Sequence, residues 1–92
     1  MKKIYVLTMV SHYWDGDGFV LEYTSHCVRV YATRRGALAA MERAIMEELE
    51  DGRYTSDQLS GPSDAYAEFT DNVNGLRRPL YTLEITEQDI ED

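Results

Sequence analysis

Residue types that carry most protein chemistry are sparse in this sequence. Its one cysteine, Cys27, directly follows His26, and the two would be the adjacent pair for a thiolate nucleophile and its base. Neighbours on a strand point to opposite faces, so these side chains cannot share a proton. The strand register preferred below places His12 about 13 Å from the position paired with His26. We therefore predict no catalytic residues and no Cys/His metal site.

The run Asp15-Gly16-Asp17 has the spacing of the first ligands of a calcium loop. An EF-hand would then need an acid or Asn near Phe19 and a glutamate where His26 stands, and the sequence has neither. Turn chemistry explains these aspartates instead. There is also no glycine-rich phosphate cradle, so we predict no cofactor and no enzyme.

Acidic side chains are the most abundant charged group. The chain has 9 Lys/Arg and 17 Asp/Glu, a net charge of −8. Residues 1–36 carry five basic against three acidic side chains (+2), residues 37–76 two against nine (−7), and residues 77–92 two against five (−3). Because phosphate recognition relies on Lys and Arg, direct nucleic-acid binding is disfavoured, whereas a basic or nucleic-acid-binding protein partner fits. The predicted contact residues are Glu42, Glu47, Glu50, Asp51, Asp57 and Asp64.

One long amphipathic helix is predicted at about residues 34–51. Thr33 can cap its first turn, and Gly52 can supply the left-handed stop. The apolar residues recur at steps of three and four, which places them on one stripe that faces the core. They are Ala37, Leu38, Met41, Ala44, Ile45 and Leu49.

Two strands, at about residues 3–13 and 19–32, precede the helix and form a predicted hairpin. A three-residue loop over residues 16–18 pairs Ile4 with Val30 and Val6 with Val28. A four-residue loop would instead pair Ile4 with Arg29 and Val6 with Cys27, which buries less apolar surface. We prefer the first register, and we expect the helix to cover the face that holds the valines.

This assignment leaves many aromatic side chains on the opposite sheet face. A bulge or the second half of the chain could cover them; otherwise the face is a self-association surface, because large exposed apolar patches are uncommon on monomers. Tyrosine is enriched in interfaces, and a homodimer is one prediction. The tyrosines of this face are Tyr5, Tyr13, Tyr23 and Tyr31.

The second half of the chain has weaker signals. Residues 60–63 read as a loop, residues 66–70 as a short strand or a helical turn, and residues 72–75, Asn72-Val73-Asn74-Gly75, as a turn. A last strand is expected at about residues 79–86, with Pro79 at its start because proline has no N–H for a ladder hydrogen bond. Residues 87–92 are expected to form a short helical turn or a frayed tail.

Ninety-two residues suffice for a single α+β domain over residues 1–92, with a ββαβ antiparallel sheet and one main helix packed on one sheet face. The basic start of the chain lacks the apolar core and cleavage site of a signal peptide. No stretch approaches the roughly 20 apolar residues of a membrane span. With one cysteine, the sequence predicts a cytoplasmic protein with no membrane partner.

The order of these segments resembles a loose group of small, mostly uncharacterised bacterial and phage proteins. The matching stretches are an Ile/Val-Tyr-Val/Leu strand at residues 4–7, a strand and Ala-rich helix at residues 28–44, and a Tyr-x-Leu-x-Ile strand at residues 81–85. The resemblance covers about half of the chain and implies ββαβ architecture, without any activity or site residue.

Two functions are therefore predicted. The first is a non-enzymatic protein-binding module, such as a phage or mobile-element accessory protein or inhibitor, that docks its acidic surface on a basic partner. The alternative is a structural or assembly protein that self-associates through the tyrosine face.

Overall fold

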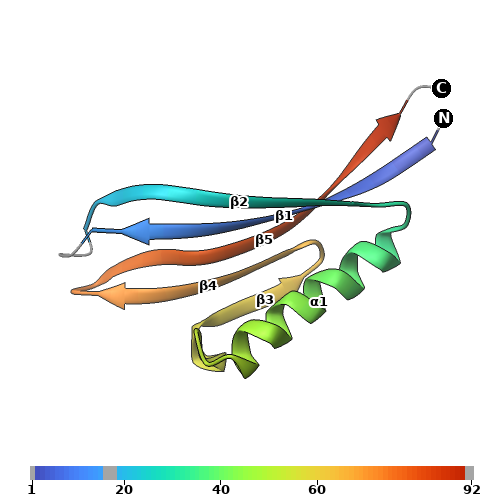
Figure 1. Cartoon of the computed structure of the whole chain (residues 1–92). Helices are drawn as coiled ribbons and strands as arrows, with labels where there is room; N and C mark the ends of the chain where they lie inside the picture. Colours follow the sequence, from blue (N-terminus) through green and yellow to red (C-terminus); the bar gives the residue numbers. More distant parts are fainter. Residues whose placement is uncertain (1, 16–18, 91–92) are drawn as a thin grey trace.

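The computed structural model of the chain describes residues 2–15 and 19–90, and its strands form one antiparallel sheet (Figure 1). The predicted turn at residues 16–18 lies outside the described residues. The elements are β1 (Lys2–Trp14), β2 (Leu21–Tyr31), α1 (Arg34–Glu50), the short 3-10 helix η1 (Ser56–Gln58), β3 (Leu59–Ser63), β4 (Tyr66–Val73) and β5 (Leu76–Ile90).

The five strands lie in the order β2-β1-β5-β4-β3. The α+β class, the antiparallel sheet and the single main helix are confirmed, but the ββαβ layout is not, because two strands, β3 and β4, stand between α1 and β5. Both β1 and β5 are long, and they pair from Lys2–Ile90 to Ser11–Tyr81 along the middle of the sheet. The two ends of the chain consequently lie side by side (Figure 1).

Helix α1 begins and ends close to the predicted residues. The Thr33 hydroxyl accepts a hydrogen bond of 3.0 Å from the Gly36 N–H, which satisfies one of the first-turn donors. Gly52, with φ of 74°, stops the helix in the left-handed region. The predicted stripe faces the sheet: Ala37, Met41 and Ile45 are buried.

The register of the first hairpin differs from both predicted registers. Val6 pairs with Val30, and Met9 pairs with Cys27, two positions away from the preferred alignment. Two features near the turn cause this difference. The Asp15 N–H donates to the Val20 carbonyl at 2.9 Å, which moves the pairing by one position, and a register shift between Tyr13 and Trp14 moves it by one more.

The assignment of the two sheet faces was inverted. The face that α1 covers, here called the helix face, carries Leu7, which is 1% exposed. Its opposite, the open face, carries Val28 and Val30, which are 52% and 59% exposed. Alternation fixed correctly which residues share a face, but both faces of this hairpin are rich in apolar residues, so periodicity could not decide which one the helix covers.

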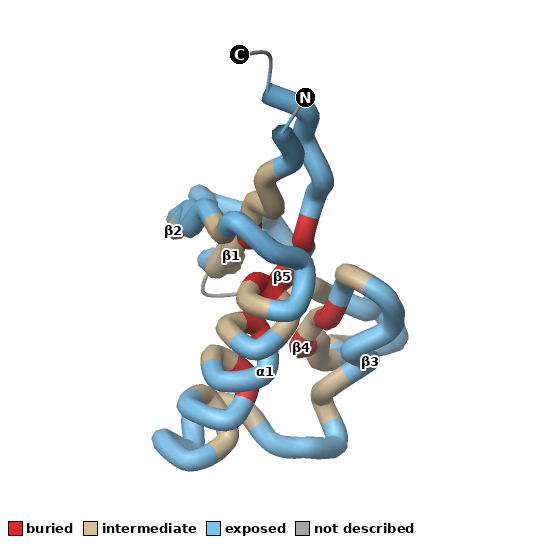
Figure 2. Tube along the Cα trace, turned by 90° about the vertical axis from the view of Figure 1, so that its right-hand side faces the viewer, coloured by how far each residue is buried: buried red, intermediate tan, exposed pale blue. Residues whose placement is uncertain are grey.

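The core lies where α1 faces β1, β4 and β5, as the buried residues of Figure 2 show. Phe69 is fully buried and stacks on Tyr54 with ring centroids 4.9 Å apart. The Tyr81 ring also stacks on Tyr54. The buried apolar side chains are Leu7, Ala37, Met41, Ile45, Ala67, Phe69, Leu83 and Ile85.

The last part of the chain contains more strand than predicted. Residues 60–63, expected to be a loop, belong to β3, and residues 66–70 form the first part of β4. The turn predicted at residues 72–75 is confined to Asn74 and Gly75, both with positive φ (51° and 84°), because Asn72 and Val73 belong to β4.

The end of the chain also differs from expectation. Pro79 lies inside β5 rather than at its start, and its partner Thr70 adjoins a register shift in β4, where the ladder is interrupted. Residues 87–90 continue β5, because they pair with β1, instead of forming a helical turn. Residues 91–92 lie outside the described part of the chain.

Within residues 2–15 and 19–90, the structure contains no helix with the length and apolar character needed to cross a bilayer.

Candidate functional site

Strand β2 forms one edge of the sheet, with β1 on one side and, within residues 2–15 and 19–90, no strand on the other. It is eleven residues long, and every residue except Cys27 and Tyr31 is exposed, as the pale β2 of Figure 2 shows. Unpaired backbone N–H and C=O groups along such an edge can pair with another strand. Proteins usually protect an edge with proline, charged side chains (lysine above all) or short length; β2 is long, has no proline or lysine, and carries only Glu22 and Arg29 as charged residues.

Strand β3 forms the opposite edge and is much less accessible to a partner strand. It has five residues, it contains Pro62, which has no N–H, and its pairing with β4 shifts between Ser60 and Ser63. The two edges of the sheet are therefore unequal, and β2 is the one that can extend it.

Apolar side chains accompany the open edge on the open face. Val28 and Val30 project beside Thr8 and Val6 of β1, which are their register partners. Because α1 packs on the other face, this valine pair remains exposed by 52% and 59%. The edge thus offers backbone hydrogen-bonding groups and apolar contact area together.

The predicted tyrosine face is the helix face, and the structure divides its four tyrosines. Tyr5 and Tyr31 are partly buried and pack against the core. Tyr13 and Tyr23 stack on each other with ring centroids 4.5 Å apart and stay 43% and 58% exposed. The second pair is the more accessible to a partner, and it lies where the end of β1 meets the start of the edge strand β2.

The six predicted acidic contact residues are all exposed but do not form one patch. Glu42 and Glu47 are five positions apart on α1, which separates them by about 140° around the helix axis. Glu50 and Asp51 lie together at the end of α1, whereas Asp57 belongs to η1. Asp64 lies between β3 and β4, with φ of 52°.

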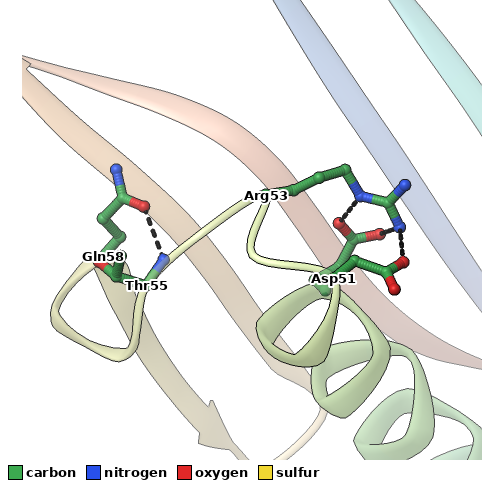
Figure 3. A network of polar contacts seen from close by, with 5 residues as sticks. Asp51, Arg53, Thr55 and Gln58 are labelled. Carbon is green, nitrogen blue, oxygen red and sulfur yellow. Dashed lines mark hydrogen bonds and ion pairs between the residues drawn. The ribbon is translucent and has the colours of Figure 1, made fainter.

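The loop after α1 is held by three polar contacts that the sequence did not indicate (Figure 3). The Arg53 guanidinium donates to Glu48 at 2.9 Å and to Asp51 at 3.0 Å, which raises the pKa of Arg53. The Gln58 side-chain oxygen accepts from the Thr55 N–H at 2.9 Å. Asp51 is thus already engaged within its own chain, which reduces its availability to a partner.

A groove runs between the end of α1 and the helix face of β2. It encloses about 360 Å³ and continues into a second hollow of about 330 Å³. Residues from three strands, the helix and the following loop line it, among them Met9, Cys27, Glu48, Arg53, Tyr54 and Tyr81. Burial raises the pKa of the Tyr81 hydroxyl to about 12.

The two histidines lie closer together than predicted. In the observed register His12 pairs with Thr24 and His26 with Val10, so the histidines are diagonal neighbours on the open face. Thr24 contacts the His26 ring at 3.0 Å, and Thr82 contacts the His12 ring at 3.3 Å. Burial, and then the charge of His26, lowers the pKa of His12. The described residues contain no group of three or more His, Cys, Asp or Glu side chains arranged for a metal ion.

These features define a small α+β protein whose antiparallel sheet has one blocked and one open edge. No protein-family model, curated protein or solved structure matches the chain.

Val28 and Val30 are the candidate residues that the sequence reasoning placed wrongly. Their alternation with Arg29 correctly indicated a strand. The opposite face of the same hairpin is more strongly apolar, and this difference could have indicated that Val28 and Val30 are the exposed side. Its apolar residues are Tyr5, Leu7, Met9 and Tyr31. The edge position of β2 had no signal of its own, because it depends on β5 occupying the other side of β1.

Proposed function

We propose that the protein is a non-enzymatic protein-binding module that adds a partner's extended segment to the β2 edge. The single observation that carries this proposal is the exposure of an eleven-residue edge strand without proline or lysine. Strand addition is a common mode of peptide recognition, in which main-chain hydrogen bonds supply affinity and alternate side chains supply specificity. Here Val28 and Val30 on one face and Tyr23 on the other would contact the added strand.

A selection of displayed peptides against the purified protein tests this function. Bound peptides should slow hydrogen exchange at alternate backbone amides of β2, because alternate residues of an edge strand direct their N–H groups outward. The double variant Val28→Lys and Val30→Lys should lose binding, since edge lysines oppose strand addition. A selection without binders, or binders that leave the β2 amides unprotected, would refute the proposal.

A matched control separates edge recognition from a general effect of charge. Met46 and Leu76 are exposed by 54% and 43% and lie on α1 and at the start of β5, away from β2. The double variant Met46→Lys and Leu76→Lys changes net charge equally and should bind peptides as the natural sequence does.

Docking of an acidic surface on a basic partner is the second candidate function. Segregation of charge favours it: residues 1–36 carry +2, whereas residues 37–92 carry 4 Lys/Arg and 14 Asp/Glu, a net −10. Such docking should weaken steeply as salt screens the charges. Glu50, at the exposed end of α1, is the best single position to test, and Glu50→Lys should slow association with a basic protein. Binding that ignores both salt and this substitution would exclude the candidate.

A further inference from the structure

We infer that the strand added at the β2 edge is β2 of a second copy of this chain, which makes the protein a homodimer with one continuous sheet. This inference rests on the proposed function and names its partner. The two copies of β2 would run antiparallel around a twofold axis perpendicular to the sheet, so each face of one copy continues into the same face of the other.

Local charge favours a second copy as the partner. Each chain carries −8 overall, so two copies repel each other across most of their surfaces. Strand β2 is an exception: it has one acidic residue, Glu22, and one basic residue, Arg29, and is neutral in sum. The edge is thus a place where two copies can meet without like-charge contact, and the −10 half of each chain begins after it.

Surface area supports the same conclusion. The chain exposes 6099 Å², whereas a monomer of this mass is expected to expose about 5,500 Å². The radius of gyration, 14.7 Å, likewise exceeds the roughly 12 Å expected for a compact chain of this length. The elongated shape of the chain, 49 × 25 × 20 Å, contributes to both values. The exposed large apolar side chains that a second copy would cover in or next to β2 are Val20, Leu21, Tyr23, Val28 and Val30.

Full overlap of the two strands defines their register. The midpoint of Leu21–Tyr31 is His26, and a twofold axis there pairs the whole strand. Arg29, for which the described residues show no ion pair, then lies opposite Tyr23 of the second copy on the helix face, a favourable cation–aromatic pair. Ser25 lies opposite Cys27 of the second copy, at about 5 Å between Cα atoms.

Sedimentation of the purified protein over a range up to high micromolar concentration tests the inference. We expect a reversible dimer, and we expect the Val28→Lys, Val30→Lys variant to raise its dissociation constant at least about tenfold. The Met46→Lys, Leu76→Lys control should dimerise like the natural sequence, provided that both variants show native circular dichroism. A monomer throughout, or a dimer unaffected by the lysines in β2, would overturn the inference.

Two further measurements sharpen the result. Ser25→Cys should form an intermolecular disulfide with Cys27 of the second copy, because directly opposed residues lie within about 7 Å of each other between Cα atoms; a dimer without this cross-link would overturn the register. If the protein is monomeric yet displayed peptides still protect β2 amides, the partner is wrong and the proposed function stands. If neither occurs, both are wrong.

Discussion

The Arg78 guanidinium lies over the ring of Trp14, with its central carbon 5.4 Å from the ring centroid. Arg78 also donates two hydrogen bonds, of 2.6 and 2.7 Å, to the Asp71 carboxylate. These hydrogen bonds, together with the charges of Asp71 and Asp15, raise the pKa of Arg78. The Trp14 indole N–H donates to the Pro79 carbonyl at 2.9 Å. This cluster ties the end of β1 to the β4–β5 hairpin, at the opposite end of the sheet from the chain termini.

Arg78→Ala should destabilise the protein by about 1–3 kcal/mol, because it leaves Asp71 without its charged donor and removes the cation–aromatic contact. The Arg78 side chain is 12% exposed, so solvent replaces these contacts poorly. Urea unfolding measures the change. Arg77→Ala is the control, since the Arg77 side chain is 61% exposed and its ion pair should contribute less than about 1 kcal/mol. Equal losses in both variants would contradict the role of the cluster.

Asp71 should make stability depend on acid pH. The hydrogen bonds from Arg78 hold the pKa of the Asp71 carboxyl below its usual value of 3.8. A depressed pKa contributes stability that is present above the unfolded-state value and is lost as pH falls through the folded-state value. Asp71→Asn should therefore be less stable than the natural sequence at neutral pH, and the gap should narrow below about pH 4. A gap that is constant with pH would show that the charge of Asp71 is not involved.

Tyr81 should limit stability at alkaline pH. Its folded-state pKa is raised from 10.0 to about 12, mainly by burial. Between these values the unfolded chain loses the phenolic proton and the folded chain keeps it, so stability declines as pH rises through this window. Tyr81→Phe removes the ionisable group and should flatten this part of the profile. Thermal unfolding across the window measures it, and an unchanged slope would argue against a buried phenol.

Leu7 and Val30 test which face of the sheet is inside. Leu7→Ala should cost about 2–5 kcal/mol, because it opens a cavity in a packed core. Val30→Ala, on the open face of β2, should change the stability of the monomer by less than about 0.5 kcal/mol. Chemical denaturation compares the two, at a low protein concentration at which the proposed dimer would be dissociated. The reverse order would restore the face assignment made from the sequence.

Local signals correctly predicted the ends of the helix and one turn. The Thr33 cap, the α1 stripe, Gly52 and the Asn74-Gly75 turn all depend on residues close in sequence, where the physical cause is visible in the residue types themselves. Hairpin register failed because it depended on the assumed loop over residues 16–18, and a change of loop length shifts every pair.

Prediction failed where long-range pairing overrides local preference. Residues 60–63 contain Gly61 and Pro62 and look like a loop, yet they form a strand because β4 supplies a partner. Residues 87–90 are polar and acidic, yet they form a strand because β1 extends beside them. The candidate site could not be predicted for the same reason, because the strand order of the whole sheet decides which strand lies at an edge.

The inequality of the two edges decides how large an assembly this chain can build. Joining two copies through β2 leaves a β3 strand at each outer rim, short and interrupted at Pro62. Because neither rim offers a long, uninterrupted edge, the proposed dimer would stop at ten strands rather than continue into a fibre. A sheet with two open edges would have no such limit. The short, irregular β3 at one edge would therefore limit the assembly that forms through β2 at the opposite edge.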